Sequence, residues 1–239
     1  MGNPVIKQQL LGILKAIDAI CLKEGLSYMM TFGTLLGAVR EKGFIEWDDD
    51  ADLMMLRKDY NAFEARCQGH LAELGLLLDR SERVPNVALV EDPSIMVDLC
   101  ILDALPKKPL HRKWQNFELK LLQGMMKKDV DYAQYDSVGK LLVFGTSTLG
   151  KFMTDEAKLK TYMRISQRAN VGGADELFMS NGLYRFMDIP FKKELVAETV
   201  RLPFEDLELL APAGWDQVLR LFFGNDYMTP KRENYYAEI

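Results

Sequence analysis

Residues 33–59, GTLLGAVREKGFIEWDDDADLMMLRKD, contain more structural information than any other part of the chain. Asp48, Asp50 and Asp52 alternate along this stretch, and the apolar residues 53–56 follow. If the stretch forms a strand, the three carboxylates point to one side, since side chains along a strand repeat with period two. Such a row repels itself unless a cation lies against it, and a divalent metal with a phosphate ligand is the usual solution. The segment is therefore a candidate active site.

Two other interpretations of these aspartates stay open. The spacing of Asp48, Asp50, Asp52 and Asp59 is similar to that of ligand positions 1, 3, 5 and 12 of an EF-hand calcium loop. The similarity fails at the sixth position, where Leu53 replaces the required glycine. A solvated acidic loop is the second alternative, and the apolar residues on both sides of the aspartates disfavour it.

The composition is that of an ordinary globular enzyme. The chain has 239 residues, 48% of them hydrophobic, which is enough for a sizeable core in one large domain or in a domain with an appendage. Thirty basic and 35 acidic residues give a net charge of −5, and no long basic run occurs. Because broad nucleic-acid binding needs many cations against phosphates, we expect a small-molecule substrate and no nucleic acid.

Cysteine and histidine form no recognisable site. The three cysteines lack CxxC spacing and the two histidines have no partner motif, so all five are expected to be structural or surface residues, in a reducing compartment; they are Cys21, Cys67, Cys100, His70 and His111. No segment approaches ~18 consecutive apolar residues, and the first residues match neither a signal peptide nor a myristoylation motif. We therefore expect a cytoplasmic protein, with peripheral contact at the inner face of the membrane left open.

Hydrophobic periodicity predicts an α+β fold, in which a small mixed sheet flanked by helices precedes a mainly helical second half. A soft boundary near residue 105 divides a catalytic core, 1–105, from a helical region, 106–239, that would contribute to substrate binding. We expect Thr34 to cap a helix starting at Leu35, and Asp59 to cap the next one. The other expected elements are helices at 4–24, 155–169 and 214–223, a helical stripe of Trp114, Phe117, Leu121 and Met125, strands at 26–32, 75–79, 86–91 and 94–103, and extended segments near 186–191 and 200–204.

Three further features bear on chemistry. Gly33 and Thr34, between a strand and a helix, offer free backbone N–H groups and a hydroxyl to an anion. Asp50 and Asp52 can each give an oxygen to Mg²⁺ or Mn²⁺. Asp98 is the single charge in the apolar segment IMVDLCI, where an isolated buried carboxylate is too costly without a partner. We interpret Asp98 as the third carboxylate of the site, with Asp48 and Asp49 as second choices for metal binding.

Several other side chains near the aspartates have two interpretations each. Arg40 suits a bidentate phosphate clamp, or else it pairs with Glu41 or Asp49. Arg57 and Lys58 could play either part. Trp47 could stack on a base or a choline group, although core packing fits a tryptophan better.

The same residues carry a resemblance to a known family. The string FGTLLGAVREKGFIEWDDDADLMMLRKDY, residues 32–60, closely resembles the signature of the LicD family, and the resemblance continues through VDLCILDALP, residues 97–106. The segment VRLPFEDLELLAPAGWDQVLRLFFGNDYMTP, residues 200–230, is similar to the closing segment of that family. Two departures are Glu46, where proline is usual, and the string FGNDY, where the family has a YGdY pattern. Neither involves an expected metal ligand.

The resemblance implies a nucleotidyltransferase-like fold, related to that of the fukutin-type transferases. It assigns phosphate binding to Gly33 and Thr34, metal binding to Asp50 and Asp52, and metal binding or activation of the acceptor to Asp98. The implied reaction is Mg²⁺- or Mn²⁺-dependent transfer of a phosphocholine-like group from a CDP-linked donor to a sugar hydroxyl, with release of CMP. The implied acceptor is a cell-surface glycan, such as lipopolysaccharide or teichoic acid, or its lipid-linked precursor.

Two other functions remain open at this point. One is nucleotidyl transfer, in which NMP from an NTP is attached to a sugar or small acceptor. The other is a catalytically silent relative that binds a glycan or nucleotide, which the full set of carboxylates disfavours. Neither the transferred alcohol nor the acceptor sugar nor the oligomeric state can be deduced. An aromatic cage for choline would draw on residues that nothing in the sequence places together: Trp114, Tyr132, Tyr135, Phe178 and Tyr184.

Overall fold

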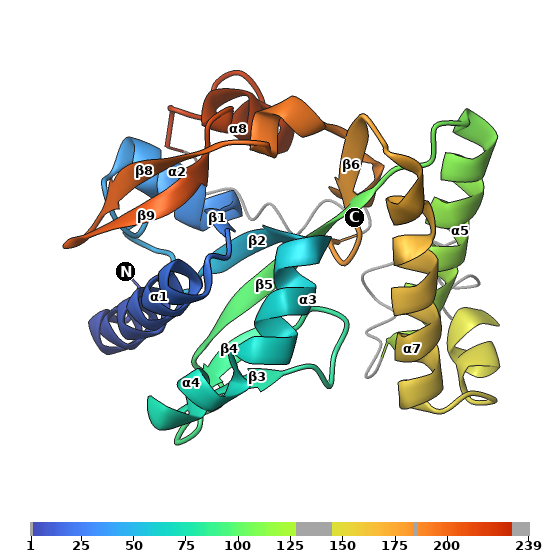
Figure 1. The fold of residues 1–239 in the computed structure, drawn as a ribbon, viewed down its shortest axis with the longest axis horizontal. Coiled ribbons are helices and arrows are strands. Elements are labelled where there is room, and N and C mark those ends of the chain that lie inside the picture. Colours follow the sequence, from blue (N-terminus) through green and yellow to red (C-terminus); the bar gives the residue numbers. More distant parts are fainter. Residues whose placement is uncertain (1, 128–144, 184–185, 231–239) are drawn as a thin grey trace. The chain divides into compact units, whose positions relative to one another are not determined.

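Figure 1 shows the computed structural model of the chain, which describes residues 2–127, 145–183 and 186–230. The chain forms two compact units. Residues up to Leu102 and from Glu176 onward form the first unit, and residues between Asp103 and Asp175 form the second. The second unit is therefore inserted into the sequence of the first. The region 106–239, predicted as one helical part, is divided between the two units.

The first helix, α1 (Pro4–Glu24), agrees with the prediction at both ends. The Asn3 side chain accepts a hydrogen bond from the backbone N–H of Val5 and so caps the helix, and a proline starts the first turn. Gly25 ends the helix with φ of 64°, a left-handed conformation that glycine adopts without a steric penalty. The buried face consists of residues at helical spacing: Leu10, Ile13, Leu14, Ile17, Ile20 and Cys21.

A seven-stranded mixed sheet forms the centre of the first unit. Its main path runs β1-β2-β5-β4-β3, and β6 pairs with both β5 and β7. Only β2 and β5 are parallel among the registers described along this path. The strands are β1 (Met29–Met30), β2 (Asp52–Leu56), β3 (Leu76–Asp79), β4 (Asn86–Leu89), β5 (Met96–Ala104), β6 (Glu176–Met179) and β7 (Phe191–Lys192). The predicted α+β class is confirmed, with every predicted strand of the first hundred residues present in shortened form.

The parallel pair β2 and β5 positions the carboxylates of interest. Asp52 is the register partner of Asp98, and the apolar residues that follow on both strands are buried. On its other side β5 is held by Asn181, a fully buried residue just after β6. The Asn181 amide accepts a hydrogen bond from the backbone N–H of Ile101 at 2.7 Å and donates one to the carbonyl oxygen of Leu99 at 2.9 Å. Two charged residues are thus anchored at the start of two well-packed strands.

Two predicted helix caps are wrong. The helix α2 (Phe32–Arg40) begins earlier than expected, so Thr34 lies in its first turn and Thr31 takes the cap position. The helix α3 (Arg57–Arg66) likewise starts before Asp59, whose buried carboxylate lies within the first turn. In both cases the preceding strand is shorter than predicted, and the chain turns directly into the helix. A short helix, α4 (Gln68–Glu73), follows α3.

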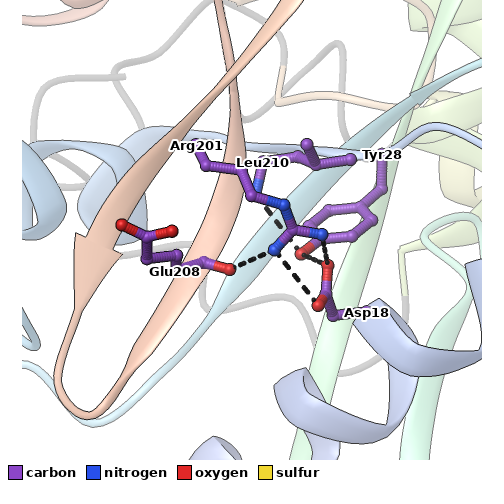
Figure 2. A network of polar contacts seen from close by, with 5 residues as sticks. All are labelled: Asp18, Tyr28, Arg201, Glu208 and Leu210. Carbon is purple, nitrogen blue, oxygen red and sulfur yellow. Dashed lines mark hydrogen bonds and ion pairs between the residues drawn. The ribbon is translucent and has the colours of Figure 1, made fainter. Parts of the chain in front are cut away.

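A hairpin of β8 (Thr199–Phe204) and β9 (Leu207–Pro212) forms a second, two-stranded sheet in the first unit. Figure 2 shows how polar side chains connect it to α1. Arg201 forms an ion pair with Asp18 at 3.0 Å, and Asp18 accepts a hydrogen bond from the Tyr28 hydroxyl at 2.8 Å. That hydroxyl accepts a hydrogen bond from the backbone N–H of Leu210 at 3.3 Å. The hairpin is thereby fixed beside the start of the main sheet.

The closing part of the first unit packs an aromatic group against α2. The elements are η3 (Phe186–Asp188), η4 (Lys193–Val196) and α8 (Trp215–Phe223). The ring of Phe32 lies 4.7 Å from that of Phe186 and 4.4 Å from that of Phe222, measured between centroids. Phe32 has a positive φ of 45°, which is strained for a residue with a side chain. The two ring contacts hold this strained residue at the start of α2.

The second unit contains α5 (Pro109–Met126), α7 (Asp155–Ser166) and η2 (Gln167–Gly172), with α5 and α7 side by side (Figure 1). Two buried glutamines of α5 donate hydrogen bonds in its interior. Gln115 donates to the carbonyl oxygens of Ile165 and Ser166, and Gln123 donates to the Tyr162 hydroxyl. The buried face of α5 differs from the predicted stripe: Leu121 and Met125 are half-buried, and Trp114 and Phe117 are exposed.

Other sequence predictions concern the thiols, the histidines and the membrane. The three cysteines are buried free thiols, and the His70 ring lies 3.2 Å from a carboxylate oxygen of Glu24. Tyr132, Tyr135 and Tyr184 lie outside the described residues, while Trp114 belongs to the second unit and Phe178 to the first. Within residues 2–127, 145–183 and 186–230, no helix combines the length and the apolar character needed to span a membrane.

Candidate active site

The aspartates of the opening segment lie on a loop and on a strand end. Asp48 and Asp50 belong to the loop before β2, and Asp52 is the first residue of that strand. The expectation that all three lie on one strand is therefore wrong, because the chain turns at Ile45 to Asp48, where a backbone hydrogen bond of 3.0 Å closes the turn. The EF-hand interpretation is also excluded, because residues 52–56, the middle of the supposed calcium loop, form a strand that pairs with β1 and β5.

Two long-range contacts hold the loop that carries these aspartates. The ammonium group of Lys7 donates to the carbonyl oxygens of Ile45 and Glu46, at 2.7 and 3.1 Å. From a position 161 residues later in the chain, a carboxylate oxygen of Glu205 accepts a hydrogen bond from the backbone N–H of Phe44 at 2.9 Å. A side chain at Gly43 would collide with that carboxylate. The loop is therefore fixed from two separate elements, α1 and the β8–β9 turn.

The start of α2 touches the same loop. A Cβ atom at Gly33 would lie 2.5 Å from a carboxylate oxygen of Asp48, so only glycine allows this approach. The hydroxyl of Thr34 accepts a hydrogen bond from the backbone N–H of Asp52 at 2.8 Å. The N–H groups of the first helical turn have no acceptor within the helix, which suits a bound anion. The structure thus brings Gly33 and Thr34 to the aspartates, and the Thr34 hydroxyl binds the backbone of Asp52.

Burial and mutual repulsion raise the pKa of several carboxyl groups here. Desolvation, followed by the charge of Asp50, raises the pKa of Asp48 to about 7. The pKa of Asp98 rises to about 6, again through desolvation first and Asp50 second. The pKa of Asp52 lies well above its ordinary value because of burial and the charges of Asp50, Asp98 and Asp48. Since the charge of Asp50 acts on the other three, Asp48, Asp50, Asp52 and Asp98 form one four-aspartate cluster.

A small cavity opens beside this cluster. It has a volume of about 130 Å³ and is lined by carboxylates and apolar side chains together with a serine: Ile6, Leu10, Asp49, Asp50, Ala51, Ser94, Ile95, Met96 and Asp98. Drug-sized ligands occupy cavities of roughly 300–1,000 Å³, so this space suits only part of a substrate, such as a phosphate with its cation. Asp50 and Asp98 therefore face one shared space.

Two matches to known proteins cover the segment that carries these aspartates. A family model described as "LicD/FKTN/FKRP, nucleotidyltransferase domain" matches residues 25–99, which include all four aspartates of the cluster. A second match covers nearly the whole chain. The lipopolysaccharide cholinephosphotransferase LicD of Haemophilus influenzae is 26% identical over 255 residues, which span 95% of this chain and 93% of that protein. Both comparisons therefore relate this chain to the LicD family.

The four-aspartate cluster has the donor chemistry of a site for a hard divalent cation. Carboxylate oxygens are the ligands that Mg²⁺ and Mn²⁺ prefer, and a cation would relieve the repulsion that raises the pKa of three members. Among the described residues, no group of three or more His, Cys, Asp or Glu side chains is arranged so that it could hold a metal ion as the structure stands. Metal binding by Asp50, Asp52 and Asp98, or by Asp48 and Asp49, stays a prediction.

The other predicted site residues are Arg40, Arg57, Lys58 and Trp47. Arg40 stands at the opposite end of α2 from Gly33, about 10 Å along the axis at ~1.5 Å per residue. Its guanidinium pairs with Glu41 at 2.6 Å. Arg57 is buried with its guanidinium 5.7 Å from the Tyr60 ring centroid, and Lys58 is exposed. Trp47 is half-buried beside Asp48 in sequence.

Two cations that the sequence did not predict flank the four-aspartate cluster. The charge of Lys7 lowers the pKa of Asp48, and that of Arg83 lowers the pKa of Asp98, each against larger effects that raise it. The Arg83 guanidinium donates to the carbonyl oxygens of Asn181 and, at 2.9 Å, Gly182. Neither residue lies in a recognisable motif, and both reach the site from distant elements. The hydrophobic periodicity of the sequence gives no signal for such contacts.

Proposed function

We propose that this LicD-type phosphotransferase moves a phosphocholine-like group from a CDP-linked donor to a sugar hydroxyl of lipopolysaccharide or a related cell-surface glycan. The observation that carries the proposal is the register pairing of Asp52 with Asp98, beside a cavity that Asp50 shares, within the segment matched by the family model. The printed name of the Haemophilus influenzae relative supports choline phosphate as the group and lipopolysaccharide as the acceptor. The CDP-linked form of the donor follows from the resemblance in sequence.

Asp98 is the general base of the proposed reaction. It lies at the cavity, on the rigid strand β5, with the positive Arg83 nearby and its neighbours Val97 and Leu99 fully buried. A carboxylate here accepts the proton of the acceptor hydroxyl while the sugar oxygen attacks phosphorus. The new bond joins that oxygen to phosphorus, the bond from phosphorus to the CMP oxygen breaks, and CMP leaves with the electron pair.

Asp50 and Asp52 are the proposed metal ligands. A bound Mg²⁺ or Mn²⁺ would neutralise the pyrophosphate of the donor and the charge of the leaving CMP. Asp52 is fixed by the strand and by Thr34, whereas Asp50 lies on the loop held by Lys7 and Glu205. The first turn of α2 offers backbone N–H groups to the donor phosphates at Gly33 and Thr34. We place the reaction in the cytoplasm.

The experiment is a pair of turnover assays on the full chain with Mg²⁺. One contains CDP-choline and deacylated lipopolysaccharide, with CMP and the modified glycan as products. The other contains CTP and the same acceptor, with pyrophosphate as product. We expect CMP release and glycan modification in the first assay and no pyrophosphate in the second. Pyrophosphate release with CTP and none of the first products would instead show nucleotidyl transfer. Binding of both nucleotides without turnover would show a binding protein.

A further inference from the structure

The second unit contains a cavity far larger than the one at the aspartates. Its volume is about 960 Å³, and α5, η2 and the segments next to them supply all of its described lining residues. This volume lies within the range of sites that enclose a ligand of drug size or larger. The proposed transfer chemistry uses none of these residues, so the cavity needs an explanation of its own.

The charge of the lining is one-sided. Five of the described lining residues are basic or can become so, and none of the described lining residues is acidic; the five are Lys107, Lys108, His111, Lys113 and Arg168. Arg168 is balanced by Glu118 at 2.6 Å, and Lys107 lies 3.9 Å from Asp175. Lys108 and Lys113 form no ion pair within the described residues. In a chain of net charge −5, this local excess of positive charge complements an anionic partner.

The same surface exposes large apolar side chains. Leu110 is 76% exposed, Trp114 58% and Val171 96%, and all three line the cavity. Phe117, 56% exposed, extends this surface along α5, with its ring centroid 5.8 Å from that of Trp114. Exposed tryptophan, phenylalanine and leucine beside lysines are typical of helices that lie in the interface of a membrane, with the rings among the headgroups. A soluble small anion would use the lysines but leave these side chains in water.

We propose that the second unit docks on the anionic surface of a lipid bilayer through this cavity and the exposed face of α5. Lys108 and Lys113 face lipid phosphates, Trp114 and Leu110 enter the boundary between headgroups and acyl chains, and the cavity receives an apolar lipid segment. The inference rests on residues of the second unit alone and does not depend on the transfer reaction. Such docking would hold the chain at the surface where a lipid-anchored glycan is presented.

The test is flotation of the full chain with vesicles of phosphatidylcholine alone or with about 30 mol% phosphatidylglycerol. We expect binding to the anionic vesicles, weak binding to the neutral ones, and release as salt rises from about 0.1 M to about 1 M. The double variant Lys108→Glu, Lys113→Glu should bind anionic vesicles at least about 30-fold more weakly, because loss of each lysine near such a surface costs about fivefold and the added glutamates are repelled as well. Leu110→Ser with Trp114→Ser should also weaken binding.

Matched controls separate this site from general charge. Lys15→Glu with Lys160→Glu changes the net charge equally at exposed positions outside the lining, and Leu22→Ser removes a 73% exposed leucine from α1. Both controls should bind anionic vesicles as the wild type does. Quenching of Trp114 fluorescence by brominated lipid provides a second readout. All altered side chains are exposed, so folding should be retained, as circular dichroism will check.

Three outcomes would overturn the proposal: no binding to anionic vesicles, equal binding to neutral ones, or equal losses in the control variants. A change of oligomeric state in the Leu110→Ser, Trp114→Ser variant without a change in vesicle binding would show that a second copy covers the surface instead. CMP release from CDP-choline with a deacylated, soluble acceptor should be unaffected by any of these variants, so a failure of the transfer reaction would be seen separately.

Discussion

Replacing Thr34 by valine tests how the fold positions Asp52. The Thr34 side chain is almost fully buried, and its hydroxyl accepts the backbone N–H of Asp52 at 2.8 Å. Valine keeps the shape but leaves that N–H without an acceptor, which costs about 1–3 kcal/mol. For a chain of this size each kcal/mol lowers Tm by about 2–4 °C, so we expect a fall of about 2–12 °C.

The effect on activity follows from the displacement of Asp52. A misplacement of about 1 Å can cost about 100-fold in rate, so Thr34→Val should lower kcat strongly and leave KM for the donor within a few-fold. Thr34→Ser retains the hydroxyl and is the matched control, with Tm and kcat close to those of the wild type. Thermal unfolding by circular dichroism and steady-state CMP release measure both quantities. An unchanged Tm in Thr34→Val, with or without a loss of rate, would refute the assigned hydrogen bond.

Two other predictions concern the loop that carries the aspartates. The raised pKa values, about 7 for Asp48 and about 6 for Asp98, mean that the folded metal-free chain binds more protons than the unfolded chain, so its stability should fall as pH rises from about 5 to about 8. The slope of stability against pH should stay below about 1.4 kcal/mol per pH unit for each carboxyl group, because solvent screens these half-buried groups. Asp48→Asn should flatten this slope. A Tm that rises over this pH range would contradict the prediction. Glu205→Ala removes the acceptor of the Phe44 N–H, with an expected loss of about 1–2 kcal/mol and a lower kcat. Glu205→Gln keeps an acceptor oxygen and should restore both, whereas equal kcat in the two variants would exclude a positioning role.

Local patterns predicted much of the fold but not the way in which the site is assembled. The helix α1 was predictable because its apolar spacing and the glycine at its end are local, and the apolar runs of β2 and β5 identified two adjacent strands. Asp98 was predicted to be the third carboxylate of the site, and the structure makes it the register partner of Asp52. The turn that removes Asp48 and Asp50 from the strand was missed, since period-two spacing does not distinguish a strand from a short acidic loop.

Other parts of the site depend on contacts between distant residues. Lys7 and Glu205 hold the loop from both sides, and Arg83 reaches Asp98 from the segment before β4. None of these three lies in a pattern with a recognisable period or motif. On α5, burial of Gln115 in place of Trp114 was likewise unpredictable, because it depends on the carbonyl oxygens that α7 supplies.

The central claim is that the four-aspartate cluster performs the transfer, with Asp98 as its base. The most direct measurement is the rate of CMP release from CDP-choline, with a glycan acceptor, by Asp98→Asn and by Asp206→Asn, a matched change at an exposed position in the β8–β9 turn. We expect Asp98→Asn to lose about 100- to 10,000-fold in kcat, with a Tm no lower than that of the wild type because a repelled buried charge is removed. Asp206→Asn should behave as the wild type. Retention of more than about a tenth of the wild-type kcat by Asp98→Asn would contradict the claim.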